Sequence, residues 1–211
     1  MKKTSLTILA ALSLLLSSCF GTGFGNTSGT SGTTANNQTG SILGTVLGSV
    51  LTNVLLGGYG QSGILGSWSY NAPSTAFTTE KTLTNAGGAA TVANITSSLA
   101  RNYTGIGISR GNTSFSFLED GKFSAKVNGI PFSGTYAYNP ENGEISLKTA
   151  TETIKGNVTK TEKGIGLMFD SKQMTNILQN EGKVSNTAAV QAISQLAKSA
   201  NGARVGFELT K

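Results

Sequence analysis

The sequence predicts a mainly β protein with helices (α+β): an eight-stranded antiparallel meander or barrel with one early helix and two late helices. Apolar residues alternate with polar ones through eight short segments, which is the period of a half-buried strand. Asp120-Gly121 and Asn128-Gly129 lie between such segments and favour tight hairpins. Three other stretches carry apolar residues at helical spacing. Eight antiparallel strands are enough to close a sheet into a barrel.

The first predicted strand spans 65–70 and places Gly66, Trp68 and Tyr70 on one face, and Pro73 is expected to end it. Six strands follow the first helix in quick succession, and an eighth lies at the end of the sequence. These seven strands are predicted over 113–118, 122–127, 130–138, 144–149, 152–159, 165–170 and 203–210. Turn chemistry and alternation agree throughout, so neighbouring strands are expected to pair in chain order.

The early helix is predicted over 86–103, with Asn85 as its N-cap. Its apolar stripe consists of Val92, Ile95, Leu99 and Tyr103. The first late helix is expected to be capped by Ser171 and to end at Gly182, with three side chains buried. These are Met174, Ile177 and Leu178. The second late helix is predicted over 187–200, before the helix stop Asn201-Gly202.

Two arrangements of these elements remain open. If strand 203–210 pairs with strand 65–70, the barrel closes and no edge is exposed. Otherwise the strands form an open α+β sheet with the helices on one face. The interior of a closed barrel is either a pocket or a solid aromatic core. Four aromatic side chains are candidates for lining a pocket: Trp68, Phe132, Tyr136 and Tyr138.

The N-terminal residues have the three-part build of a secretory signal. Lys2 and Lys3 precede an apolar run, and Leu16-Ser17-Ser18-Cys19 resembles the lipobox of bacterial lipoproteins at all four positions. We therefore expect residues 1–18 to be a signal peptide and Cys19 to carry lipid after cleavage. Cys19 is the single cysteine, so the chain forms no internal disulfide.

The rest of the sequence divides into three parts. Residues 19–40 hold the lipidated cysteine and a flexible tether of Gly, Ser, Thr and Asn. Residues 41–64 are an uncharged apolar segment in which glycines recur every four positions over its first part. This segment is expected either to lie in the membrane interface or self-associate, or to dock on the domain or continue the tether. Residues 65–211 form the β domain.

Composition excludes several classes of function. After cleavage the chain keeps fourteen basic and ten acidic residues, a net charge of +4, with both signs mixed along it. That pattern is typical of a solvated surface, so no nucleic-acid partner is expected. The chain has no histidine, which removes the commonest general base and metal ligand. Glu119, Asp120, Glu141 and Glu144 lie at turns, and Asp170 precedes a helix. We expect no catalytic residues, metal or cofactor, and hence no enzyme.

Gly66-Ser67-Trp68 resembles the G-x-W start of lipocalins, in which a basic side chain from the end of the chain covers the tryptophan. Arg204 is the candidate for that cation–π contact. A wider pattern includes G-S-W-S-Y, F-x-E-D-G-K-F, S-G-T-Y and G-F-E-L. Over residues 65–211 it is similar to a family of lipocalin-like lipoproteins from Bacteroidetes. The resemblance implies a lipocalin-like barrel, distorted or plugged by the helices, but no reaction.

Two functions remain open from the sequence. In the first, the lipid-anchored domain binds a small apolar or amphipathic molecule inside the barrel. In the second, it is a structural or interaction module that contacts an envelope protein. In lipoproteins of this type, surface export is associated with acidic residues after the cysteine. Phe20-Gly21-Thr22-Gly23 has none, so we expect the periplasmic side of the outer membrane.

Overall fold

The computed structural model describes residues 59–185 and 187–211. These fall within one of the two units into which the chain divides, Asn37–Lys211. The predicted signal peptide at 1–18, the lipidated Cys19, the tether at 20–40 and the glycine-spaced run at 41–58 lie outside the described residues.

Eight antiparallel strands form a closed barrel in which each strand pairs with its neighbours in sequence. They are β1 (Gly66–Phe77), β2 (Ser114–Phe117), β3 (Lys122–Val127), β4 (Ile130–Tyr138), β5 (Glu144–Lys148), β6 (Thr153–Lys160), β7 (Ile165–Phe169) and β8 (Ala203–Thr210). β8 pairs with β1 from Ser69↔Thr210 to Phe77↔Ala203 and closes the ring. The predicted barrel is confirmed, and the open sheet is wrong.

Turn residues set the register of the meander. Asn128 and Gly129 both have positive φ, 51° and 82°, and join β3 to β4 as a two-residue hairpin. Only a turn of this handedness matches the twist of the two strands, and Asn-Gly adopts it at low cost. The resulting register pairs Val127 with Ile130, as the alternation of apolar residues predicts.

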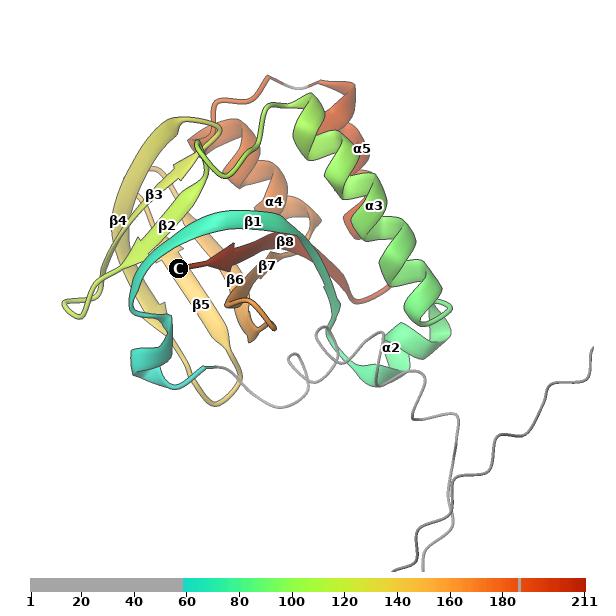
Figure 1. Cartoon of the computed structure of the whole chain (residues 1–211), viewed down its shortest axis with the longest axis horizontal. Coiled ribbons are helices and arrows are strands. Elements are labelled where there is room, and N and C mark those ends of the chain that lie inside the picture. The colour runs from blue at the N-terminus through green and yellow to red at the C-terminus, as the bar shows by residue number, and fades with distance from the viewer. Residues whose placement is uncertain (1–58, 186) are drawn as a thin grey trace, which may run out of the picture. The chain divides into compact units, whose positions relative to one another are not determined.

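Helices occupy two of the connections, and both connections lie at the same end of the barrel. α2 (Glu80–Asn85) and α3 (Ala89–Gly105) join β1 to β2. α4 (Ser171–Asn176), the π-helix η2 (Ile177–Glu181) and α5 (Ala188–Lys198) join β7 to β8. A short 3-10 helix, η1 (Gln61–Ile64), precedes β1. Figure 1 shows α3 and α5 side by side against one flank of the barrel, with α4 between them and the strands.

Three predicted boundaries are wrong. β1 continues through Pro73 to Phe77. Beyond Ser69, β1 pairs with β8 but no longer with β2. Pro73 has no N–H to donate, and it is tolerated here because one side of the strand has no neighbouring strand to accept a hydrogen bond. Asn85 ends α2, which Thr79 caps, instead of capping the early helix. The early helix itself is α3, which begins after Gly88 without a side-chain cap. Asp170, and not Ser171, caps α4 by accepting a hydrogen bond from Gln173 N at 2.8 Å.

Aromatic side chains fill the barrel. The ring of Phe207 on β8 lies 6.1 Å from Tyr70, 5.7 Å from Phe115 and 6.4 Å from Phe169, between ring centroids. Tyr103 reaches this cluster from α3, 5.6 Å from Phe207, and its hydroxyl donates to Gly206 O at 3.1 Å.

Helical side chains complete the core. The predicted α3 stripe is buried, and Met174, Ile177 and Leu178 are each 0% exposed, as predicted. Within the described residues, no helix has both the length and the apolar character needed to cross a bilayer.

Candidate functional site

Trp68 is buried near the start of β1, at one end of the barrel. It is 4% exposed, and its Nε1 donates to the carbonyl of Ile64 in η1 at 2.7 Å. The basic side chain above its ring is Lys211, whose Nζ lies 4.8 Å from the ring centroid. The predicted contact with Arg204 is therefore wrong, because Arg204 pairs with Ala76 at the opposite end of β1.

The other three predicted ligand-binding residues lie along β4. Phe132 packs edge-on against Phe115 and Phe123, with ring centroids 6.3 and 6.0 Å away. Tyr136 packs on Phe117, and its hydroxyl donates to Leu118 O at 2.9 Å. These side chains belong to the packed wall of the barrel.

Tyr138 is half-buried near the end of β4. Its hydroxyl donates to Tyr59 O at 2.6 Å, and burial raises the pKa of Tyr138 to about 12. Of the four predicted residues, Tyr138 alone contributes to the lining of the cavity described next, so the four do not form one site.

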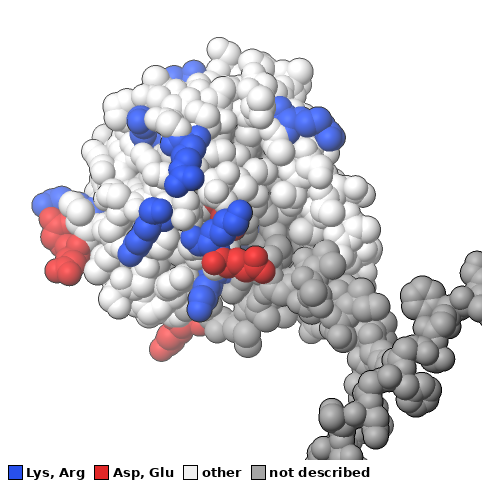
Figure 2. All heavy atoms as spheres, viewed as in Figure 1, with Lys and Arg blue, Asp and Glu red and all other residues white. Residues whose placement is uncertain are grey.

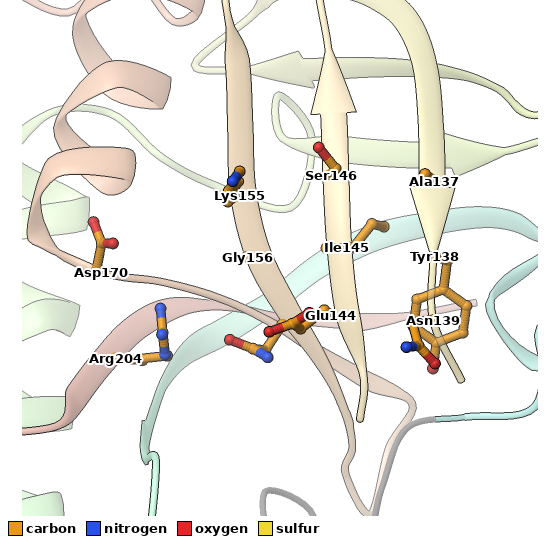
Figure 3. Close-up of a pocket in the computed structure, with 11 residues that line it drawn as sticks. Ala137, Tyr138, Asn139, Glu144, Ile145, Ser146, Lys155, Gly156, Asp170 and Arg204 are labelled. Atoms are coloured by element: carbon orange, nitrogen blue, oxygen red, sulfur yellow. The ribbon is translucent and has the colours of Figure 1, made fainter. Parts of the chain in front are cut away.

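A cavity of about 470 Å³ lies against the outer face of β4, β5 and β6. We call it the outer groove. Its lining residues are Ala137, Tyr138, Asn139, Glu144, Ile145, Ser146, Lys155, Gly156, Asn157, Asp170 and Arg204. Figure 3 shows Ala137, Ser146 and Lys155 in one row across the three strands, with Asp170 and Arg204 near each other at the α4 side.

Strand register builds this row. Ala137 pairs with Ser146, and Ser146 pairs with Lys155, so the outward side chains of three strands lie next to one another. The β6–β7 ladder ends at Asn157↔Met168, and beyond it the chain leaves β7 for α4. The backbone N–H of Lys155 donates instead to Gln173 Oε1 of α4 at 3.1 Å. Asp170 and Arg204 line the groove from this side of the sheet.

The groove carries charges of both signs, and these form no ion pairs with one another or with other described residues. Lys155 and Arg204 are basic, and Glu144 and Asp170 are acidic. Among the described residues, the single ion pair is Lys122–Asp120, which lies elsewhere. Arg204 Nε is buried and has no hydrogen-bond partner in the part of the chain that the structure describes. A buried donor without an acceptor costs about 1–3 kcal/mol, so an acceptor brought by a ligand would be stabilising.

Polar side chains in two smaller cavities are already used within the fold. The cavity of about 170 Å³ beside α3 includes Thr75, which accepts a hydrogen bond from Thr96, and Glu208, which accepts one from Asn71. The cavity of about 260 Å³ beside α2 includes Thr91, which donates to Ala86 O. The outer groove is larger than these two cavities, and its charged side chains form fewer hydrogen bonds and ion pairs with other described residues.

On the face shown in Figure 2, basic side chains are scattered over otherwise uncharged surface, with a few acidic side chains beside them. Within the described residues, no three acidic side chains gather closely enough to hold a metal ion.

The sequence-based candidates do not identify the groove, because all four of them lie on the inward faces of the strands. The sequence places Glu144 at a turn and Asp170 just before a helix. Both descriptions hold locally, since Glu144 is exposed and Asp170 caps α4. The sequence does contain one signal for the groove: outward positions in 144–146 and 155–157 are polar. The register of the β5–β6 hairpin places these polar side chains next to one another.

Comparison with known families gives one match. The family model described as "Lipocalin-like domain (DUF4923)" matches residues 42–211. Neither the search of curated proteins nor the search of solved structures found a match.

Proposed function

The chain belongs to this lipocalin-like domain family, and we propose that it is a lipid-anchored binding module of the cell envelope, with its ligand in the outer groove. One observation carries the proposal: a cavity of about 470 Å³ whose charged side chains have no ion-pair partners among the described residues. Ligand pockets typically measure about 300–1,000 Å³.

A site outside the barrel accounts for the packing better than a site inside it. Phe207 and its ring neighbours occupy the interior that an apolar or amphipathic ligand would need. The outer groove instead offers polar groups, which favour a small polar molecule. The proposed role is binding and not catalysis, because the chain has no histidine and its one cysteine is the proposed lipid attachment site.

The proposed anchor would hold the domain at a membrane of the cell envelope. The lipobox-like Leu16-Ser17-Ser18-Cys19 supports attachment to the membrane through lipid on Cys19, and the absence of acidic residues in 20–23 supports the periplasmic side of the outer membrane. Two or more acyl chains would make such an anchor durable.

Native mass spectrometry of the protein purified from its own envelope tests the binding role. We expect wild type to carry a small polar molecule and Ser146→Trp, which fills the groove, to lose it. Ser124→Trp is the matched control, because Ser124 is an exposed outward residue of β3 that does not line the groove. Circular dichroism verifies that both variants fold.

Two results would contradict the proposal. Retention of the ligand by Ser146→Trp would place it elsewhere, including the barrel interior. A wild-type protein that carries no small molecule would favour the second function considered from the sequence, an interaction module that contacts an envelope protein.

A further inference from the structure

We propose that the ligand of the outer groove is a sugar acid, a molecule with one carboxylate and several hydroxyl groups, and that Arg204 binds the carboxylate. The inference rests on the proposed binding function and adds the chemical class of the ligand. It follows from the three kinds of side chain that the groove brings together: two cations, two carboxylates, and neutral amide and hydroxyl groups.

Arg204 is the strongest indication of an anionic group. Its Nε is buried without an acceptor, and its guanidinium forms no ion pair among the described residues. A guanidinium presents its donors in a planar fork that matches the two oxygens of a carboxylate. Lys155 adds a second positive charge to the lining, where Ser146 pairs with it across β5 and β6.

The acidic residues argue against a bare anion. Glu144 and Asp170 bring as many negative charges to the lining as Lys155 and Arg204 bring positive ones. Such a lining has little net attraction for a simple ion, so the ligand must also carry hydrogen-bond donors that the carboxylates accept. Asp170 keeps one oxygen for this purpose, since only Oδ1 is used to cap α4.

Hydroxyl groups are the donors that suit the remaining residues. Asn139 and Asn157 have amides that donate and accept, and Ser146 has a hydroxyl that does both. Figure 3 shows Arg204 and Asp170 at the α4 side of the groove, and Glu144, Tyr138 and Asn139 on the side of β4 and β5. The carboxylate of the ligand would therefore lie toward Arg204 and its hydroxyls toward Asn139 and Glu144.

Isothermal titration calorimetry with three probes tests the class of ligand. D-glucuronate carries the carboxylate and the hydroxyls, D-glucose only the hydroxyls, and acetate only the carboxylate. We expect glucuronate to bind at least about tenfold more tightly than either of the others, because it alone combines the charge-assisted hydrogen bonds of a carboxylate with the donors of several hydroxyl groups. Trigalacturonate distinguishes a free sugar acid from one within a polysaccharide. Whether it binds more or less tightly than glucuronate, the ligand remains a sugar acid.

Variants test the role of Arg204. Arg204→Gln should weaken glucuronate binding by at least about tenfold and leave glucose binding unchanged. Lys155→Gln is a second test, and it should also weaken glucuronate binding. Because Lys155 is an exposed residue of β6, this change does not disturb β8. Arg110→Gln is the control, because Arg110 is exposed in a loop outside the groove. Circular dichroism and urea unfolding confirm that each variant is folded.

The two proposals fail differently. If glucose binds as tightly as glucuronate and Arg204→Gln changes nothing, the sugar-acid assignment is overturned while a ligand in the groove remains. If no probe binds but native mass spectrometry finds a molecule that Ser146→Trp loses, the assignment is likewise overturned. If Ser146→Trp retains the molecule, the groove itself is the wrong site.

Discussion

Lys211 Nζ lies 4.8 Å from the ring centroid of Trp68, so the residue that follows β8 covers the tryptophan at the start of β1. Antiparallel pairing explains why Lys211 occupies this place and Arg204 does not. Because β1 and β8 run in opposite directions, the start of β1 lies beside the end of β8, as in Ser69↔Thr210. Arg204 is near the start of β8 and is opposite Ala76.

Removing Trp68 should strongly destabilise the domain. Trp68→Ala leaves a cavity at the barrel end and the Ile64 carbonyl without its donor, and we expect a loss of about 3–5 kcal/mol in the free energy of unfolding. Lys211→Ala should cost about 0.5–1 kcal/mol, the value of an exposed cation–π contact. Urea unfolding followed by circular dichroism measures both, since the chain has no other tryptophan for fluorescence. Equal losses in the two variants would contradict this account.

Gly206 should tolerate no side chain. A Cβ at this position would lie 1.9 Å from the backbone oxygen of Leu167, an atom held by the β7–β8 ladder. Gly206→Ala should therefore cost at least about 3 kcal/mol in the free energy of unfolding, at the upper end for overpacking. Gly111→Ala is the control, because nothing lies within 4 Å of its Cβ, and it should change stability by less than about 0.5 kcal/mol. Similar unfolding midpoints would show that the strands can separate to accept the methyl group.

The barrel could be predicted from the sequence because local signals agree. Alternation sets the inward face of each strand, and residues such as Asn128 and Gly129 fix the turns between them. β3, β4 and β8 begin and end at the predicted residues. Pro73 misled the prediction because its effect depends on whether a neighbouring strand is present on its N–H side. The presence of a neighbouring strand depends on the assembled sheet, so it cannot be inferred from the residues around Pro73.

The candidate site was harder to predict. Its residues come from β4, β5, β6, β8 and the start of α4. They meet because the pairing of β6 with β7 ends at Asn157↔Met168, close to the point where the chain enters α4. Polar residues on outward faces are also the normal composition of a solvated surface, so no single position indicates binding. The predicted aromatic residues were correctly placed on inward faces, but packing against Phe115, Phe117 and Phe123 gives most of them a structural role.

Stability should decrease at alkaline pH because of buried tyrosines. Burial raises the pKa of Tyr70 to about 12 from the ordinary value of 10.0, and raises that of Tyr103 well above it, with the nearby Tyr70 adding to the effect. The folded state thus favours the neutral phenol. Its contribution to stability is complete below about pH 10 and is lost as the pH rises toward 12 and beyond.

Urea unfolding at a series of pH values, with tyrosine ionisation followed by ultraviolet difference absorbance, checks this prediction. We expect the free energy of unfolding to decline above about pH 10, while Tyr70 and Tyr103 remain un-ionised in the folded protein. Tyr70→Phe removes one of the two groups and should make the decline shallower. Ionisation of all five tyrosines near pH 10 with the fold intact would contradict the burial of these phenols.

Cys19→Ser should prevent lipid attachment, because a serine has no thiol to acylate. We expect the variant to accumulate as an uncleaved precursor or as a soluble protein, whereas wild type is extracted with the membrane. Intact-mass measurement of the extracted wild-type protein decides the matter, since it should show a chain that starts at Cys19 with an acyl increment. Ser28→Ala, a change in the proposed tether that keeps the thiol, is the control and should be processed as wild type. A mature wild-type mass with no acyl increment would remove the anchor, and with it the proposed location of the binding module in the envelope.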